Sequence, residues 1–284
     1  MARRTHRPDV VTWNDVNSHD GFPSFPSQRF LAEGDSWFTM SGVPAYNLLF
    51  KLRFYAITQI VNCAFPGDTI VHMSQLANNR HYREALTTPG FKWKAIFLSG
   101  GGNDLIDRAD EILMPKRQRD PAASAPADFC DQSELRDVIA DVQQGFRRLS
   151  AVRDSSRSKS GKAPIVTHTY DYATPRDAHA RFFIVKLGPW LHPALKSAKV
   201  PKSKWVPIAD YLIDELAKGI LALQEGSDRI KNFHVVDTRG AAKRAAPGTT
   251  GSSHDWQNEI HPNDDGYRKI ARRVEKKLDT LIPR

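Results

Sequence analysis

A serine hydroxyl lies directly after a short apolar stretch near the start of the chain. The stretch begins at Phe30 and stops at Gly34, and Asp35 and Ser36 follow just before a candidate helix. Open α/β sheets hold their ligand sites at the carboxyl ends of the strands, so a hydroxyl placed there is a candidate nucleophile. The alternative is an ordinary turn, in which glycine takes unusual φ angles and Asp or Ser caps the next helix.

Three further polar stretches follow later apolar runs. Gly67 ends the first of them, the loop from Ser99 to Asn103 contains three consecutive glycines, and His261 lies just before the last predicted helix. A serine hydroxyl is a weak nucleophile until a base takes its proton, and histidine has a suitable pKa at neutral pH. We predict His261 as that base, because the loop before the last helix returns to the sheet edge where Ser36 lies.

In this order, the four stretches resemble the sequence blocks of the SGNH, or GDSL, hydrolase family over residues 30 to 275 or so. The resemblance implies a serine esterase or lipase in which Ser36 forms an acyl-enzyme. It also implies an oxyanion hole made of the backbone N–H groups of Ser36 and Gly67 and the side-chain amide of Asn103. The chemistry agrees, because glycine lets the backbone approach a substrate closely and a neutral amide donates N–H to a developing oxyanion.

The third member of a catalytic triad is the point where the chain departs from this family. The family pattern places an aspartate three residues before the histidine, and this chain has Asn258 there. In a serine protease, the same change from acid to amide lowers kcat about ten-thousandfold. We predict Asp255 as the acid instead, six residues before His261. Glu259 is a second candidate, and a Ser–His dyad oriented by Asn258 or by a backbone carbonyl is a third.

Two other polar residues lie at the same predicted edge. We expect Asp35, beside the nucleophile, to hold the turn rather than to serve as the triad acid. His168 comes at the end of a predicted strand, where either substrate contact or packing would explain it.

Alternating strand and helix patterns predict how these residues come together. Apolar runs predict strands at about 30–34, 55–64, 93–99, 163–170 and 233–237, and helical spacing predicts helices at about 46–54, 69–86, 135–152, 208–223 and 265–281. Such alternation is typical of a parallel sheet with helices on both faces. We therefore predict a flavodoxin-like three-layer α/β/α sandwich with five parallel strands, which is also the SGNH hydrolase fold.

The domain organisation is predicted from composition. Residues 1–28 carry two Phe-Pro pairs without a sustained period and are predicted to form an N-terminal arm, followed by the hydrolase domain at 29–284. Two insertions interrupt that domain, at about 105–133 and 172–205. For the second insertion, which is rich in aromatic residues, Pro and Lys, the alternatives are a cap over the site and a surface helix packed on the sheet.

Composition limits the partners. The 284 residues are 40% hydrophobic and 26% charged, which is ordinary for a soluble globular protein, and the net charge is +9. No cluster has metal-ligand spacing, so we predict neither a metal nor another cofactor. The basic residues are not interleaved with the aromatic motif of a nucleic-acid module, so nucleic acid is not expected as a partner. The positive charge leaves an anionic membrane surface as an alternative partner.

The cellular location is predicted from the composition of the N-terminus and from the number of cysteines. The N-terminus is basic but lacks the apolar core of a secretory signal, and no run of eighteen apolar residues occurs. Cys63 and Cys130 are expected as free thiols. We therefore predict a cytoplasmic protein, with export as an effector as the alternative.

These features predict a carboxylester hydrolase that acts on small-molecule, short-acyl esters. A phospholipase or lipase is the first alternative, suggested by the positive charge and by the aromatic residues at 181–205. The second alternative is a non-catalytic module that keeps the fold and binds a ligand, and its support is Asn258.

Overall fold

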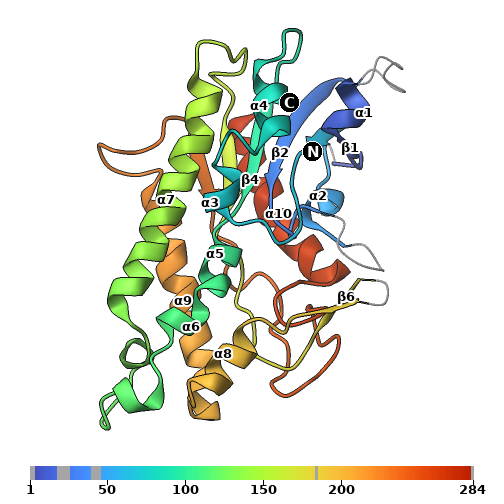
Figure 1. The fold of residues 1–284 in the computed structure, drawn as a ribbon. Coiled ribbons are helices and arrows are strands. Elements are labelled where there is room, and N and C mark those ends of the chain that lie inside the picture. The colour runs from blue at the N-terminus through green and yellow to red at the C-terminus, as the bar shows by residue number, and fades with distance from the viewer. Residues whose placement is uncertain (1–3, 18–25, 40–45, 183–184, 283–284) are drawn as a thin grey trace.

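The apolar runs form one parallel sheet, whose strands all end on the same side of the molecule. The computed structural model describes residues 4–17, 26–39, 46–182 and 185–282. Neighbouring strands are parallel throughout, in the order β1-β3-β2-β4-β5-β8 (Figure 1). Their bounds are β1 (Asp9–Thr12), β2 (Gln28–Gly34), β3 (Thr58–Asn62), β4 (Ala95–Ser99), β5 (Ile165–His168) and β8 (Phe233–Val236).

The sheet has one strand more than predicted. β1 lies within the residues predicted to form an arm, and it pairs in parallel with β3, with Val10 opposite Ile60. A segment of four residues with two apolar side chains is too short to show a strand period, which explains why the sequence did not indicate it. The other five strands lie at the predicted positions along the chain. The direction of winding reverses between β2 and β4, where α/β sheets of this kind bind ligands.

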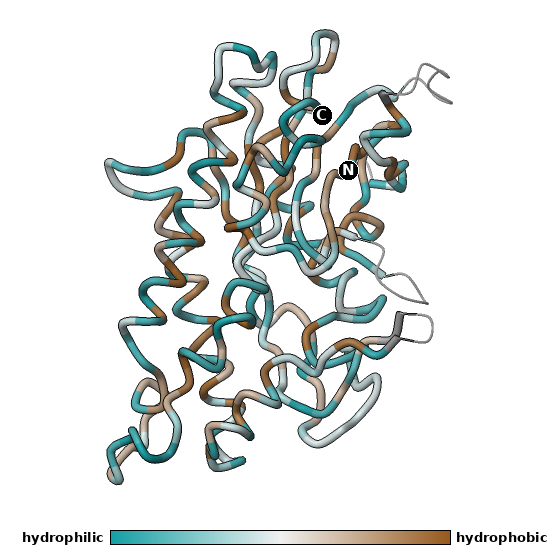
Figure 2. The backbone as a smooth tube through the Cα atoms, viewed as in Figure 1, coloured by the Kyte–Doolittle hydropathy of each residue, from teal (hydrophilic) through white to brown (hydrophobic). Residues whose placement is uncertain are grey.

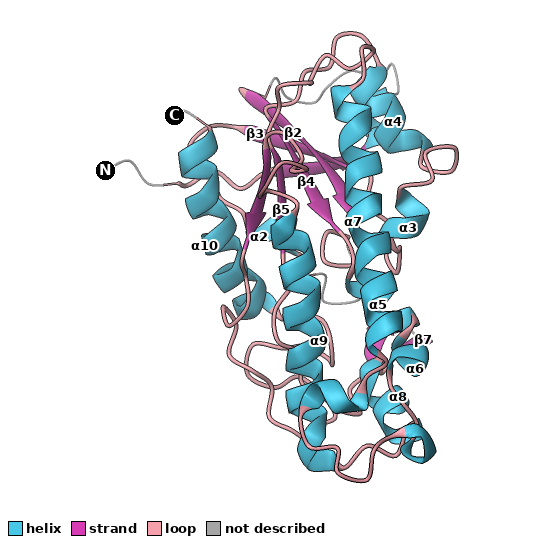
Figure 3. Ribbon diagram, turned by 90° about the vertical axis from the view of Figure 1, so that its left-hand side faces the viewer, coloured by secondary structure: helices cyan, strands magenta, loops and turns pink. Residues whose placement is uncertain are grey.

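Helices cover both faces of the sheet and complete the predicted three-layer sandwich (Figure 3). On one face, α10 (Asp264–Leu281) packs against α2 (Leu48–Lys51). On the other face, α7 (Gln132–Asp154) contacts α3 (Ile70–Met73), α4 (Arg80–Thr87) and α9 (Lys202–Ala222). A short helix, α1 (Trp13–Asn17), follows β1. Among these described residues, none of the helices has both the length and the apolar character needed to cross a membrane.

The helix predicted at 69–86 is two helices. The break lies before Asn79, whose side-chain oxygen accepts a hydrogen bond from the backbone N–H of Tyr82 and so caps α4. The amide of Asn79 also donates to the carbonyl of Met73 at the end of α3. An asparagine that bonds to nearby backbone in this way competes with helix continuation, so the helical period is interrupted.

The core lies between the sheet and its helices. Phe30, Leu31, Ile60, Ile96 and Ile165 are all 0% exposed. Parallel strands covered on both faces need such continuous apolar runs. Figure 2 shows the hydrophobic segments concentrated along the central strands and the facing sides of the helices, with hydrophilic loops outside.

Both predicted insertions lie beyond the carboxyl ends of the strands, and they touch one another (Figure 1). The Arg119 guanidinium of the first donates to the carbonyls of Ala198 and Lys199 in the second. Their elements are α5 (Gly102–Asp107), α6 (Ala109–Ile112), the 3-10 helices η1 (Lys116–Gln118) and η2 (Pro126–Phe129), the hairpin of β6 (Ala180–Phe182) and β7 (Val185–Leu187), and α8 (Leu191–Ser197). Residues 1–3 and 18–25 of the predicted arm and residues 183–184 of the second insertion lie outside the described residues.

A close approach between β2 and β4 brings Gly34 against Ser99. The two residues are opposite one another in the parallel pair, and a Cβ on Gly34 would lie 2.7 Å from both Cβ and the carbonyl oxygen of Ser99. Real side chains do not tolerate that separation, so only glycine fits at the last position of β2.

We therefore expect Gly34→Ala to lower the free energy of unfolding by about 1–3 kcal/mol, because an extra methyl group must push the two strands apart. Urea denaturation measures the change. Gly161→Ala is the matched control, since its added Cβ would meet its nearest neighbour at 3.6 Å, an ordinary contact. Equal stability of the two variants would show that the strands separate without cost.

Candidate active site

The structure brings Ser36 and His261 together across 225 residues of chain. Ser36 Oγ lies 2.7 Å from His261 Nε2. Ser36 comes directly after β2, and His261 lies in the loop before α10. Each residue is 7% exposed, and both line a pocket of about 480 Å³. A serine and a histidine in this contact can exchange a proton, which is the first requirement for nucleophilic catalysis by serine.

The turn after β2 fixes the position of the serine. The Asp35 carboxylate accepts a hydrogen bond from the backbone N–H of Trp37 at 3.0 Å, and its carbonyl accepts from that of Phe38 at 3.1 Å. An aspartate that bonds to the backbone two residues later is typical of such turns. The two interpretations of Gly34, Asp35 and Ser36, as a turn and as the site of a nucleophile, are thus compatible, because Asp35 forms the turn that presents Ser36.

Asn258 takes the position beside His261 that an acid would occupy in a triad. Its Oδ1 lies 3.0 Å from His261 Nδ1 and also accepts hydrogen bonds from the backbone N–H groups of Ile260 and His261, at 3.1 and 2.9 Å. Two backbone donors identify this atom as the oxygen, so Nδ1 must carry the ring proton. Nε2 is then the basic nitrogen, and it is the one that faces Ser36.

The prediction of Asp255 as the acid is corrected by this geometry. The Asp255 carboxylate forms a salt bridge with Lys269 of α10 at 2.5 Å and accepts from the backbone N–H of Lys243. The imidazole of His261 instead meets Asn258, as in the third alternative. The reason is local: the chain turns back after Asp255, whose carbonyl accepts from the N–H of Asn263, so its side chain faces α10.

Glu259 is also turned away from the histidine. Its carboxylate accepts hydrogen bonds from the backbone N–H groups of Trp190, Leu191, His192 and Arg176. Burial raises the pKa of Glu259 to about 7, although these four donors favour the charged form. Its role is therefore to join the histidine loop to the second insertion, which the sequence did not indicate.

The three predicted oxyanion donors line the same pocket as the Ser–His pair. They are Ser36, Gly67 and Asn103. Gly67 has a φ of 81°, a left-handed conformation that favours glycine. The Asn103 amide donates to the carbonyl of Asp68 at 2.8 Å, which fixes the side chain and uses one of its two N–H donors. This arrangement can surround a carbonyl oxygen of a bound ester.

The carboxylate of Asp104 holds this loop in place. It accepts from the backbone N–H groups of Ile70 and Val71 at 2.8 and 3.2 Å, and so connects the start of α5 to the start of α3. The donors on Gly67 and Asn103 therefore come from two segments that are tied together.

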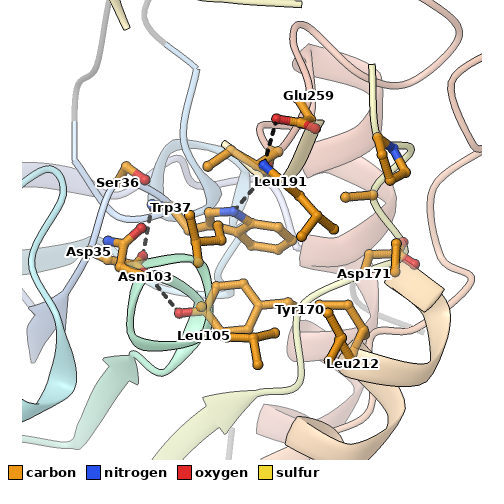
Figure 4. Close-up of a pocket in the computed structure, with 17 residues that line it drawn as sticks. Asp35, Ser36, Trp37, Asn103, Leu105, Tyr170, Asp171, Leu191, Leu212 and Glu259 are labelled. Atoms are coloured by element: carbon orange, nitrogen blue, oxygen red, sulfur yellow. Dashed lines mark hydrogen bonds between the residues drawn. The ribbon is translucent and has the colours of Figure 1, made fainter. Parts of the chain in front are cut away.

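A second serine–histidine pair, Ser99 and His168, is connected to the first through Asp35, the residue before Ser36. His168 Nδ1 accepts from the backbone N–H of Tyr170 at 3.2 Å, so Nε2 carries the proton and donates to Ser99 Oγ at 3.0 Å. Ser99 Oγ donates in turn to Asp35 at 2.8 Å. The Tyr170 hydroxyl donates to the other oxygen of Asp35 (Figure 4). Burial lowers the pKa of His168 to about 3, so this histidine stays neutral.

Ser99, His168 and Asp35 have the composition of a triad, but their hydrogen bonds run in the wrong direction for one. In a triad the histidine takes the serine proton and the acid holds the histidine. Here the histidine donates to the serine, and the serine donates to the acid. Ser99 and His168 are 1% and 2% exposed, and Trp37 stacks on the His168 ring at 5.0 Å. Packing, not substrate contact, thus explains His168.

A model of the GDSL-like lipase/acylhydrolase family matches residues 32–269. The chain belongs to this family. The SGNH/GDSL resemblance and the α/β fold with its parallel sheet are thereby confirmed, and the enzyme class is that of the carboxylester hydrolases. A comparison with curated protein sequences finds no match.

Solved structures that resemble this GDSL-family chain share little sequence with it. An aryl esterase of M. smegmatis is 11% identical with a TM-score of 0.43, covering 90% of this chain and 100% of that one. A possible lipase of Chitinophaga pinensis is 13% identical with a TM-score of 0.43, covering 89% and 98%. A salicylyl-acyltransferase from a tetracycline biosynthetic pathway is 15% identical with a TM-score of 0.45; the match covers 92% of this chain but 56% of the acyltransferase.

Across the described ranges, no three His, Cys, Asp or Glu side chains gather closely enough to hold a metal ion.

Burial lowers the pKa of His261 from 6.5 to about 4. The imidazole must be neutral to accept a proton, so activity is retained above that pKa and lost as the pH falls through it. We expect the acid limb of kcat/KM near pH 4, measured on a soluble ester with circular dichroism at each pH to show that the fold persists. An acid limb near 6.5 would show that His261 titrates as an exposed histidine.

Replacing Asn258 tests its role beside the histidine. In Asn258→Asp, a carboxylate next to Nδ1 stabilises the imidazolium, so the acid limb should move up by at least about one pH unit. Asn258→Ala removes the acceptor that sets the tautomer, and kcat should fall by between about a hundredfold and ten-thousandfold. Asp255→Asn is the control and should leave the acid limb in place. A large loss of kcat in Asp255→Asn would instead return Asp255 to the catalytic machinery.

Proposed function

We propose that the protein hydrolyses short-acyl carboxylic esters through an acyl-enzyme formed on Ser36. The observation that carries the proposal is the 2.7 Å contact between Ser36 Oγ and His261 Nε2, in a pocket that Gly67 and Asn103 also line. The predicted nucleophile, base and oxyanion donors are thus neighbours in space. An apolar cavity of about 60 Å³ beside Ser36 supports the short acyl group.

Acylation begins when His261 Nε2 takes the proton of Ser36 as Oγ attacks the ester carbonyl carbon. The N–H groups of Ser36, Gly67 and Asn103 stabilise the negative charge that develops on the carbonyl oxygen. The tetrahedral intermediate collapses, the C–O bond to the alcohol breaks, and the alcohol leaves with the proton from His261. The acyl group is then bound to Ser36 Oγ.

Deacylation repeats these steps with water. His261 takes a proton from a water molecule, whose oxygen attacks the acyl carbon. The new intermediate expels Ser36 Oγ, which recovers the proton from His261, and the carboxylic acid is released. Asn258 holds the imidazole through both halves of the reaction but supplies no negative charge to the imidazolium. A neutral partner is expected to give a slower turnover than an aspartate.

The first test is hydrolysis of p-nitrophenyl acetate, butyrate and decanoate by the wild type and by Ser36→Ala. We expect Ser36→Ala and His261→Ala each to lower kcat at least about a thousandfold, and the double variant to be no slower than either, because the two residues act as one unit. Equal rates for wild type and Ser36→Ala would overturn the proposal.

A fluorophosphonate gives a second measurement that needs no knowledge of the natural substrate. An activated serine displaces fluoride and forms a P–O bond, so the labelled peptide found by mass spectrometry should contain Ser36. Ser36→Ala should remain unlabelled. Wild-type protein that neither reacts with the reagent nor hydrolyses the esters would favour the non-catalytic ligand-binding module.

A further inference from the structure

Ser36 lies between two cavities of different size and polarity. The small cavity, about 60 Å³, is the apolar one beside Ser36, and the large cavity is the 480 Å³ pocket that also holds His261. Ser36, Asn103 and Ile260 line both of them. An ester whose carbonyl carbon sits at Ser36 Oγ therefore has one cavity for each of its two halves.

The small cavity is lined mostly by apolar side chains (Figure 4). The rings of Trp37 and Tyr170 border it, and the aliphatic residues that α5, α8 and α9 contribute are Leu105, Ile106, Leu191, Ala209, Leu212 and Ile213. Asp35, Asp171 and Glu259 also border it, but hydrogen-bond donors engage all three carboxylates. The Trp37 N–H and the Ser99 and Tyr170 hydroxyls donate to Asp35. The backbone N–H groups of Gly240 and Ala242 donate to Asp171, and those of residues 190–192, at the start of α8, donate to Glu259. A group that enters this cavity thus meets hydrocarbon.

The size of the small cavity limits the chain that enters it. Its volume holds about four to six water-sized groups, which corresponds to an acyl chain of about four carbons beyond the carbonyl. Ala209 and Leu212, one turn apart on α9, are 2% and 1% exposed. Because such residues are closely packed, a longer chain must displace them.

The large cavity has a mixed lining and lies on the side of the base. Tyr46, Leu187, Trp190 and Gln257 contribute to its walls, and the Trp190 ring meets the His261 ring edge-on at 5.3 Å. The alcohol oxygen must take its proton from His261 Nε2 when it leaves. His261 lines the large cavity and is absent from the described lining of the small one, so the alcohol half is directed into the large cavity.

Glu259 binds one residue from the lining of each cavity. Its carboxylate binds the adjacent N–H groups of Trp190 and Leu191. Trp190 faces the large cavity and Leu191 faces the small one. Glu259, two positions before His261, therefore fixes a lining residue of the large cavity and one of the small cavity relative to each other.

We propose that the small cavity binds the acyl chain and the large cavity binds the alcohol, so that the substrates are esters of a short apolar acid with a bulky alcohol. Ala209 and Leu212 determine the longest acyl chain that is accepted. This inference rests on the proposed chemistry at Ser36, which supplies the point from which the two halves diverge.

Isomeric esters test the orientation directly. Octyl acetate and ethyl octanoate have the same composition, but the first carries its bulk in the alcohol and the second in the acid. We expect kcat/KM to favour octyl acetate at least tenfold, since a methylene that a pocket accepts or rejects changes kcat/KM about tenfold or more. Ser36-dependent hydrolysis that favours ethyl octanoate would overturn the inference while leaving the proposed function intact.

Variants of α9 test the residues. Ala209→Leu fills the small cavity and should lower kcat/KM for hexyl butyrate at least tenfold, with less than a threefold change for octyl acetate. Leu212→Ala enlarges the cavity and should raise kcat/KM for ethyl octanoate about tenfold. Leu187→Ala, in the large cavity and 49% exposed, is the matched control, which should alter KM for octyl acetate but not the preference for acyl length.

The two proposals fail in different ways. If neither isomer is hydrolysed in a Ser36-dependent manner, the proposed function fails and the inference falls with it. If hydrolysis depends on Ser36 but both α9 variants keep the wild-type preference for acyl length, the cavity assignment alone is wrong. Thermal denaturation of each variant confirms that the comparison is made between folded proteins.

Discussion

The buried carboxylate of Asp35 is the interaction on which the site depends. It accepts from the Ser99 hydroxyl, the Tyr170 hydroxyl and the Trp37 N–H, and so connects the ends of β2, β4 and β5. Burial raises the pKa of Asp35, and an unsatisfied carboxylate in that place would be costly, so these donors must stay in position. Ser36 is the next residue, and its hydroxyl takes its place from this network.

Parallel topology explains why so much of the site could be read from the sequence. Strand ends in such a sheet meet at one edge, so Ser36, Gly67 and Asn103 were expected there before any distance was known, and the loop before the last helix adds His261. The sixth strand was missed because β1 shows its character only through pairing with β3.

The neighbour of the histidine could not be predicted in the same way. Counting residues favoured Asp255, but the position of a side chain in a loop depends on where its carbonyl and amide bond. The return of the chain to Asn263 and the attraction of Lys269 turn Asp255 toward α10. Of the three candidates, only Asn258 lies three residues before His261, as the acid does in the family pattern. Likewise, nothing in the sequence showed that Glu259 would bind the start of α8 at residues 190–192.

The walls of the two cavities differ in how much a substitution in them disturbs the rest of the protein. Ala209 and Leu212 belong to α9, which packs against α7 in the body of the protein, whereas Leu187 lies half exposed on a two-stranded hairpin. A substitution on the hairpin disturbs few contacts, while one on α9 also disturbs the core. Among diverging descendants of this chain, the hairpin side of the site is therefore freer to change than the side that α9 forms.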